Sequence, residues 1–434
     1  MNTKRMLSVL ISAVMLLSGV TAVSAEDTVV ATIGDKEYTS LEDLETGAFI
    51  AACTGENKNV VLQADVTIST TIKVLKDSGD VTFDLNGHTI TSSADPVIRV
   101  YDKSSLTVND NVGTGKIKAT TKYAAGIECG LSSSETENAK SKLIVNGGTI
   151  EASYAIFPIN DADVILNNGV YDGWVYTNGG YKNSNITINN GEYKKAFYLA
   201  AGKGSKYEIN GGSFTETENS TIEIKGGTLT INGGTFTNTS DTQELEYNGN
   251  GSSSAGYALA VLAHKAYQGA DVVVNGGTFN GYVGLNDVPE GVEVNSTLTI
   301  NGGSYVNDIS SYVPAGSKVI KIGDKYGIAE VKETEVTEVT EETTKEAVKE
   351  GLNEKVSLNE NTTEKIETFS LSDLAAAYLV RATYNVSDGE KSGTVDVDFD
   401  LGNAEIGGSA AFGVVFYNVP AGITIGAPVI SVAR

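Results

Sequence analysis

The sequence is poor in the residues that build metal and redox sites. Its 434 residues include only two cysteines, two histidines and six prolines. Structural zinc and iron–sulfur sites use about four soft ligands, so this composition leaves little for such a site. With so few prolines, the 48 glycines do not indicate collagen or a proline-rich disordered chain.

Positive charge is also scarce. The chain has 31 Lys and Arg against 55 Asp and Glu, which gives a formal net charge of −24. Nucleic acids and anionic membrane surfaces attract proteins with a basic face, so this balance argues against both as partners. Apolar residues make up 40% of the chain, which is enough to fill a core, and the length allows roughly two or three domains.

The long hydrophobic run of this chain lies at its N-terminus. Lys4 and Arg5 precede a mostly apolar run from Met6 to Val20, and Val23-Ser24-Ala25 has the small residues of a cleavage site. The run is shorter than the roughly 20 residues of a membrane span. We therefore expect residues 1–25 to be a secretory signal peptide, with a signal anchor as the alternative. The mature chain is then secreted or extracellular, without membrane insertion, and cell-wall association is one option.

One motif recurs through the centre of the chain. Two or three alternating apolar residues precede Asn-Gly-Gly-Thr/Ser-aromatic or a close variant, and the motif asparagines are Asn146, Asn167, Asn189, Asn210, Asn232, Asn275 and Asn301. Successive copies lie 21, 22, 21, 22, 43 and 26 residues apart. The step of 43 is either two periods or one period enlarged by a loop. The segment Thr237–Ser254 is the candidate loop, because it is rich in Ser, Asn, Thr and Gly.

This period suits short strands and leaves no room for a helix. Apolar and polar residues alternate within each unit, as in Leu298–Ile300, which is the period of a strand. Two or three short strands per turn predict a parallel β-helix over residues 59–329, with roughly ten or eleven coils stacked about 4.8 Å apart. We expect the motif asparagines to form a ladder. A second, apolar stack should contain the residues four positions later: Ile150, Tyr171, Tyr193, Phe214, Phe236, Phe279 and Tyr305.

The segments on either side of the repeats have different patterns. Within residues 26–58, the stretch from Ser40 to Ala52 has a capping residue, early acidic residues and helical apolar spacing, which predicts a short helix that caps the β-helix. Residues 330–367 hold 12 Glu and 5 Lys without an aromatic residue. We expect an acidic, extended or partly helical linker there, with an interaction tail as the alternative. Residues 368–434 predict a small β-sandwich.

Several segments resemble a known family. VTFDLNGHTI (81–90), the TINGGTF-type copies and SSYVPAGSKVIKIGDKYGI (310–328) resemble secreted bacterial proteins with a pectate-lyase-like, right-handed parallel β-helix. Members of that family include polysaccharide lyases, glycoside hydrolases and non-catalytic surface or adhesin-like proteins, so the resemblance does not choose a function. The expected fold class is all-β: a right-handed parallel β-helix with an N-terminal helical cap, an acidic linker and a small C-terminal β-sandwich.

Catalytic patterns are sparse in the repeats. The resemblance implies that a lyase would use clustered carboxylates for Ca²⁺ and an Arg or Lys as base. Arg99 is the one arginine of the expected β-helix, and Asp95 and Asp102 lie near it in sequence, but no carboxylate cluster recurs at the coil spacing. Hydrolases need paired acids. Asp161 and Asp163 alternate on one strand face without matching acids in the next coil, so we assign no catalytic residue.

No cofactor is expected, with Ca²⁺ as the one option. Asp396, Asp398 and Asp400 share one face of an alternating strand near the C-terminus. Three carboxylates could hold Ca²⁺, which binds oxygen ligands. The alternative is a solvated acidic face.

Residues 171–206 are rich in aromatic residues and lysines. They hold seven aromatic residues, and five lysines against two acids. Counted from the motif asparagine, Tyr176 and Tyr198 are equivalent, point outward and stack one coil apart, and Trp174 shares their parity. Exposed rings on a rigid sheet suit sugar rings, and ammonium groups favour an acidic glycan. The predicted glycan-binding residues are Trp174, Tyr176, Tyr181, Lys182, Lys194, Lys195 and Tyr198. A face packed under a loop or a neighbouring chain is the alternative.

These observations predict a secreted or cell-surface β-helix without catalytic activity. It would bind a polysaccharide or cell-surface glycan, or act as an adhesin-like scaffold. One alternative is a polysaccharide lyase or glycoside hydrolase that acts on a neutral or acidic polysaccharide. Another is a structural stalk that holds the C-terminal domain away from a cell wall.

Overall fold

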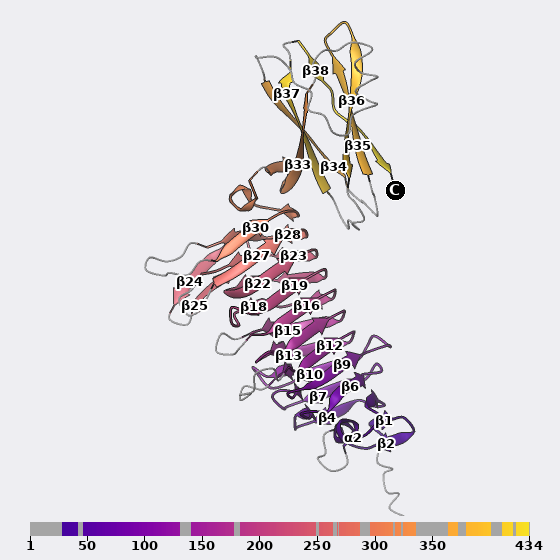
Figure 1. The fold of residues 1–434 in the computed structure, drawn as a ribbon. Coiled ribbons are helices and arrows are strands. Elements are labelled where there is room, and N and C mark those ends of the chain that lie inside the picture. The colour runs from indigo at the N-terminus through magenta and orange to yellow at the C-terminus, as the bar shows by residue number, and fades with distance from the viewer. Residues whose placement is uncertain are drawn as a thin grey trace, which may run out of the picture.

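The computed structural model of this chain consists mostly of short β-strands. It describes these residues: 28–41, 47–130, 140–177, 183–248, 251–263, 267, 269–286, 296–315, 317–322, 324–335, 363–371, 379–400, 410–419 and 422–433. The described strands form a parallel β-solenoid of about nine turns and a small C-terminal antiparallel sheet. Figure 1 shows the coils as successive rungs of a rod.

One face of the rod is a parallel sheet with one strand from each coil. Its strands are β3 (Asn59–Leu62), β6 (Gly79–Asp84), β9 (Ser104–Asn109), β12 (Lys142–Val145), β14 (Asp163–Leu166), β16 (Asn185–Ile188), β19 (Lys206–Ile209), β22 (Gly226–Ile231), β27 (Gly269–Val274) and β30 (Thr297–Ile300). These ten strands mark about nine full turns, slightly fewer than the ten or eleven coils expected. Two coils are longer than the others: their hydrogen-bonded asparagines lie 37 and 43 residues apart. The same length of chain therefore makes fewer turns.

Two further rows of strands complete each coil. The second row contains β4 (Val66–Ile68), β7 (Thr89–Ser92), β10 (Lys116–Ala119), the first part of β13 (Thr149–Pro158) and of β15 (Val170–Tyr176), β17 (Glu192–Tyr193), β20 (Ser213–Glu216), β23 (Thr235–Asn238), β28 (Thr278–Asn280) and β31 (Ser304–Tyr305). The third row contains β5 (Ile72–Val74), β8 (Ile98–Val100), β11 (Ala125–Cys129), the ends of β13 and β15, β18 (Phe197–Leu199), β21 (Ile222–Ile224), β26 (Tyr257–Val261) and β29 (Tyr282–Leu285).

Both predicted ladders are confirmed. Each motif asparagine donates its Nδ2 hydrogen to the Oδ1 atom of the asparagine one coil earlier, over 2.7–3.0 Å, and the ladder starts one coil before the first predicted member, at Asn109. The aromatic stack from Tyr171 to Tyr305 is buried, with neighbouring ring centroids 4.5–4.9 Å apart. The last glycine of each motif has φ between +85° and +128°, a conformation that other residues adopt at a cost.

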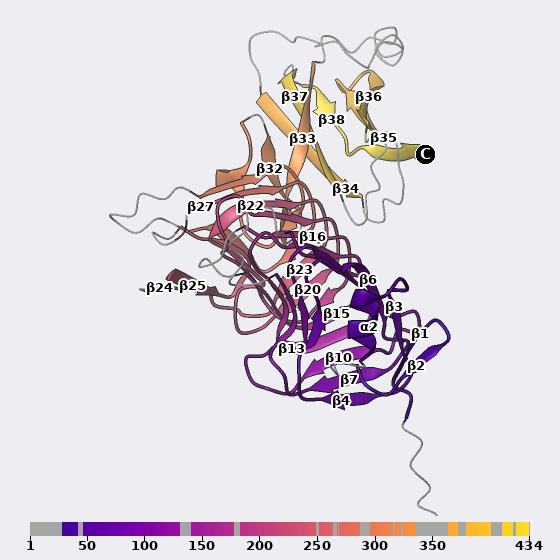
Figure 2. The ribbon, with the colours of Figure 1, turned by 60° about the horizontal axis from the view of Figure 1, so that its bottom comes forward.

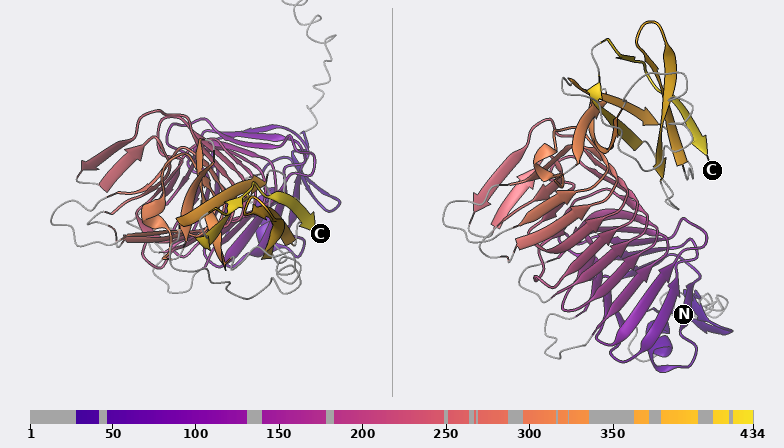
Figure 3. Two further views of the ribbon diagram at one scale, coloured as in Figure 1. Left: turned by 90° about the horizontal axis from the view of Figure 1, so that it is seen from above. Right: turned by 45° about the horizontal axis from the view of Figure 1, so that its top comes forward.

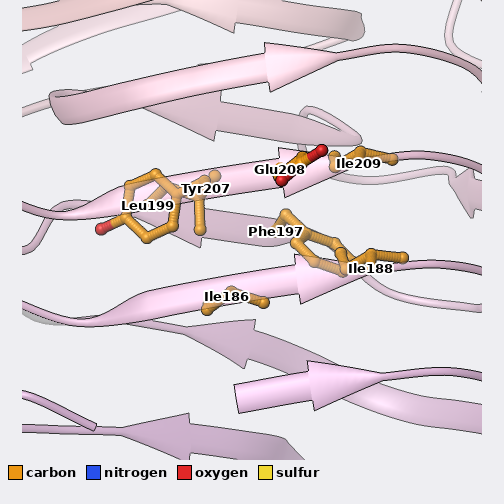
Figure 4. Close-up of a pocket in the computed structure, with 7 residues that line it drawn as sticks. All are labelled: Ile186, Ile188, Phe197, Leu199, Tyr207, Glu208 and Ile209. Carbon is orange, nitrogen blue, oxygen red and sulfur yellow. The ribbon is translucent and has the colours of Figure 1, made fainter. Parts of the chain in front are cut away.

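The interior of the rod is a packed core. The side chain of Phe197, in the third row, points towards Ile188 and Ile209 of the first row (Figure 4). The space that these side chains enclose is too small for a water molecule. A ligand of this part of the rod must therefore bind on its outer surface.

The long coil between Asn232 and Asn275 contains an inserted hairpin. Strands β24 (Glu244–Asn248) and β25 (Gly251–Ala255) pair antiparallel and project from the side of the rod (Figure 1). The Asn275 amide still bonds to the Asn232 amide over 2.9 Å. The step of 43 residues is therefore one period plus a loop, as one of the two interpretations proposed.

A short helix lies at the N-terminal end of the solenoid (Figure 2). Helix α2 (Ala48–Thr54) buries four residues, and its Phe49 ring packs edge-on against Phe83 with centroids 4.9 Å apart. The Cys53 sulfur accepts a hydrogen bond from the Leu75 amide over 3.3 Å, just after β5. Strands β1 (Ala31–Ile33) and β2 (Lys36–Tyr38) pair antiparallel beside β3. Of the helix predicted between Ser40 and Ala52, α2 accounts for the second half, and residues 42–46 lie outside the described ranges.

The C-terminal strands follow directly from the last coil. Strand β33 (Lys325–Glu335) pairs antiparallel with β32 (Lys318–Ile322) and β31, and its second half pairs with β37 (Ala410–Val419), as does β34 (Thr363–Leu371). Residues 330–335 and 363–367, placed in the linker by the sequence, are therefore strands. A small antiparallel sheet contains β35 (Leu379–Ser387), β36 (Ser392–Asp400), β38 (Thr424–Ile425) and β39 (Val429–Ala433) (Figure 3).

Candidate functional site

Three of the predicted glycan-binding rings come together on the outside of the third row. In β15 the Val175 side chain is buried, whereas Trp174 and Tyr176 are partly exposed. Tyr176 pairs in register with Tyr198 of the next coil, as the repeat predicted. Their rings stack with centroids 5.0 Å apart and planes 20° apart. The Trp174 ring centroid lies 6.5 Å from both.

Two further rings, from β13, belong to the same group and were not predicted. Tyr154 lies 5.0 Å and Phe157 lies 5.5 Å from the Tyr176 ring centroid. Counting from the motif asparagine misses them, because β13 contains irregularities before and after Tyr154 that shift its register with β15. Ile156, rather than Ala155, is consequently the partner of Val175. We define the aromatic strip as Tyr154, Phe157, Trp174, Tyr176 and Tyr198.

The rings of the aromatic strip are not equally available to a ligand. Tyr176 and Tyr198 each cover one face of the other, and the Lys225 ammonium lies over the Tyr198 ring. Trp174 has no described ring centroid closer than 6.5 Å. Sugar rings contact aromatic faces through C–H groups, so Trp174 is the best-placed member of the strip for such a contact.

A buried ion pair closes the C-terminal end of the strip. The Lys225 ammonium lies 4.3 Å above the Tyr198 ring, donates to the Tyr198 hydroxyl over 2.8 Å and lies 2.8 Å from the Glu223 carboxylate. Glu223 also accepts two 2.6 Å hydrogen bonds from Ser254 of β25. Burial raises the pKa of Tyr198 and of the nearby Tyr267 to about 12. Both phenols therefore stay protonated at neutral pH, and Lys225 is neutralised by its own partner.

The predicted lysines do not join the strip in the described part of the chain. Lys194, directly after β17, lies 3.5 Å from Glu192 of that strand, in an exposed ion pair. Lys195 is partly exposed in the turn between β17 and β18. Tyr181 and Lys182 lie outside the described residues. Of the three predicted lysines, two are therefore described, and neither has a described contact with the rings of the strip.

A second ion pair lies in the same longitudinal row, N-terminal to the strip. Arg99, Glu128 and Phe157 are register partners in successive coils. The Arg99 guanidinium meets the Glu128 carboxylate at 2.7 and 3.1 Å. Burial raises the pKa of Glu128, and Arg99 opposes this rise. Arg99 is therefore held by a carboxylate, which is a poor arrangement for a catalytic base.

Three of the acidic residues considered for catalysis or Ca²⁺, namely Asp163, Asp396 and Asp398, have other partners. Asp163 accepts a 2.6 Å hydrogen bond from Asn185. Asp398 accepts two 2.6 Å hydrogen bonds from Arg381, which also lies 3.4 Å from Asp396. Within the described ranges, no group of three or more His, Cys, Asp or Glu side chains is placed to hold a metal ion.

Comparison with models of protein families, with curated proteins and with solved structures finds no match to this chain. The structure and the repeat motif therefore carry the functional argument. Among the described helices, none has both the length and the apolar character needed to cross a membrane.

Proposed function

We propose that this chain is a secreted or cell-surface protein without catalytic activity, which binds a polysaccharide or cell-surface glycan on the aromatic strip. The observation that carries the proposal is the partly exposed Trp174, which lies beside the stacked rings of Tyr176 and Tyr198 on the outside of the rod. Aromatic rings that remain partly exposed in a group often mark a binding surface.

The fold supports this proposal because it holds the rings rigidly. Tyr176 and Tyr198 sit on paired strands, and the backbone pairing fixes their spacing. Lys225 adds a cation–π contact and a hydrogen bond at Tyr198. A site that is ordered before binding loses little conformational entropy when the ligand arrives.

The finer features of the fold belong to the same proposal. We take the solenoid to be a right-handed, pectate-lyase-like β-helix with α2 as its N-terminal cap. The C-terminal strands are proposed to form a small β-sandwich. Signal-peptide cleavage after residue 25 would release the chain from the cell, and the strongly acidic surface suits a soluble extracellular protein.

The single tryptophan makes the proposal directly testable. The chain contains one Trp and 20 Tyr, so tryptophan emission of purified residues 26–434, excited at a wavelength that tyrosine does not absorb, reports on the aromatic strip. We expect titration with a panel of neutral and acidic polysaccharides to shift or quench this emission for at least one of them. The variants Tyr176→Ala and Tyr198→Ala are expected to weaken that binding about two- to tenfold each, from the energy of one aromatic contact.

A matched control separates the strip from other exposed aromatic residues. Tyr282 is 40% exposed and lies on β29, outside the strip, so Tyr282→Ala should leave binding unchanged. Unchanged affinity in the Trp174→Ala/Tyr176→Ala/Tyr198→Ala variant, measured by retention on the immobilised polysaccharide, would remove the proposed site. Release of new reducing ends from any polysaccharide would instead favour the lyase or hydrolase alternative.

One observation favours the second candidate function, a structural stalk. Strand β33 runs without a break from the last coil into its pairing with β37, so the rod and the C-terminal strands share one strand. A stalk would not depend on the rings. Retention of a cell-wall fraction by the triple variant at wild-type strength would support the stalk against the glycan-binding scaffold.

A further inference from the structure

Tyr123 is an unusual residue beside the aromatic strip. Its side chain is 62% exposed, and its backbone has φ of +65°. Left-handed backbone disfavours a bulky residue, and glycine, asparagine and aspartate are the usual occupants. Four of the other five described non-glycine residues with positive φ are indeed Asn or Asp. A large ring held outward by costly backbone is a candidate for a binding role.

The Tyr123 backbone lies one coil before the first ring of the strip. Its amide donates to Ser153 Oγ over 2.9 Å. The next residue, Ala124, accepts a 3.1 Å hydrogen bond from the Tyr154 amide, and Ala125 of β11 is the register partner of Tyr154. The turn that carries Tyr123 therefore continues the strip by one coil towards the N-terminus.

An ammonium group accompanies this ring. The Lys122 Nζ lies 4.6 Å from the Tyr123 ring centroid. Within the described ranges, Lys122 has no carboxylate at ion-pair distance. Asp95, which approaches the same turn, accepts a 3.0 Å hydrogen bond from the Ala125 amide. Lys122 thus differs from Lys225 and Arg99, whose charges are each balanced by a buried glutamate.

We propose that Lys122 and Tyr123 form a second contact point for the glycan, which receives a carboxylated sugar unit. The exposed Tyr123 ring packs against the sugar ring, and the Lys122 side chain, which has no carboxylate partner in the described ranges, swings from the Tyr123 ring to pair with the sugar carboxylate. Trp174 contacts another unit of the same chain. This inference rests on the proposed glycan binding and adds to it a site and a charge preference.

The experiment uses probes that differ only in the carboxylate. Hexasaccharides of alginate and of hyaluronan, each in native and carboxyl-reduced form, are titrated against residues 26–434 with Trp174 fluorescence as the readout. Lys122→Gln should weaken binding of a native probe about two- to fivefold at low salt, less at high salt, and leave the reduced form unaffected. The matched control Lys142→Gln, on the first-row strand β12, should change neither.

The Tyr123→Gly variant separates binding from folding. Glycine suits the left-handed backbone at this position, so the melting temperature should rise or stay constant. Affinity for native and reduced probes should fall about two- to tenfold, the loss expected for one aromatic contact. A structural role for Tyr123 would lower the melting temperature instead and would overturn the inference.

The failures of the two proposals give different results. If Trp174 responds to a glycan but both variants bind like the wild type, the second contact point is wrong and the strip remains. If Trp174 responds only to neutral glycans, the charge preference is overturned in the same way. If Trp174 responds to none of the probes and to none of the panel polysaccharides, the proposed function itself fails.

Discussion

The buried aromatic stack permits a quantitative test of how the solenoid is stabilised. Phe236 is completely buried and stacks between Phe214 and Phe279, with centroid distances of 4.7 Å on both sides. Replacing it with alanine removes both ring contacts and leaves a cavity that neighbouring coils cannot easily fill. We expect Phe236→Ala to lower the free energy of unfolding by about 3–5 kcal/mol. The two stacked pairs account for roughly 1–3 kcal/mol of that loss.

A tyrosine at the same position is the matched control. The three tyrosines of the stack donate their hydroxyl to the carbonyl three residues earlier, as Tyr193 does to Asn190 over 3.0 Å. A tyrosine at position 236 can reach the Gly233 carbonyl in the same way. Phe236→Tyr should therefore change the free energy of unfolding by less than about 1 kcal/mol in either direction, because a new hydrogen bond offsets the added polar atom.

The assay is denaturant unfolding followed by two signals. Circular dichroism reports on all strands, whereas Trp174 fluorescence reports on β15, several coils away from Phe236. Solenoids unfold with nearest-neighbour coupling, so the two midpoints need not coincide in a weakened variant. A loss below about 1 kcal/mol for Phe236→Ala, or equal losses for the Ala and Tyr variants, would refute the stacking argument.

Two more predictions concern polar groups on the rod. Asn210→Ala removes both side-chain hydrogen bonds of one ladder position and should lower the free energy of unfolding by about 1 kcal/mol. The loss stays this small because the two partner asparagines remain exposed to water. An unchanged urea midpoint would contradict a stabilising ladder. Hydrogen bonds from Lys118 and Lys116 lower the pKa of Glu151. Its stabilising contribution is thus present above the unfolded-state pKa and is lost as the pH falls through the lower folded-state pKa. Glu151→Gln should therefore destabilise the protein at neutral pH and reduce its loss of stability on acidification, as measured by thermal melts.

The repeat made most of the solenoid predictable from sequence. Steps of 21 and 22 residues keep equivalent positions in register, so the amide ladder and the pairing of Tyr176 with Tyr198 could be read directly from the motif. Both depend on contacts between neighbouring coils that share one spacing. A regular period therefore allows contacts between neighbouring coils to be predicted from the spacing of residues in the sequence.

Features that break the period could not be predicted in this way. The irregular register of β13 hid Tyr154 and Phe157 from the count. Lys225 reaches Tyr198 from a position 27 residues later, after an interval that no motif describes. The strand ends around Glu335 and Thr363 pair with β37. Their acidic composition resembles that of a solvated spacer, but pairing with a distant strand outweighs local strand propensity.

The long coil also bears on how the surface of this rod could be altered. Between Asn232 and Asn275 the path is 43 residues rather than 22, yet the amide bond and the stacking of Phe236 on Phe279 are the same as elsewhere. Lengthening a surface connection costs little free energy when its ends remain fixed. The corner after β23 is thus an insertion point, where a new recognition loop could be grafted while the neighbouring coils keep their sequence and register.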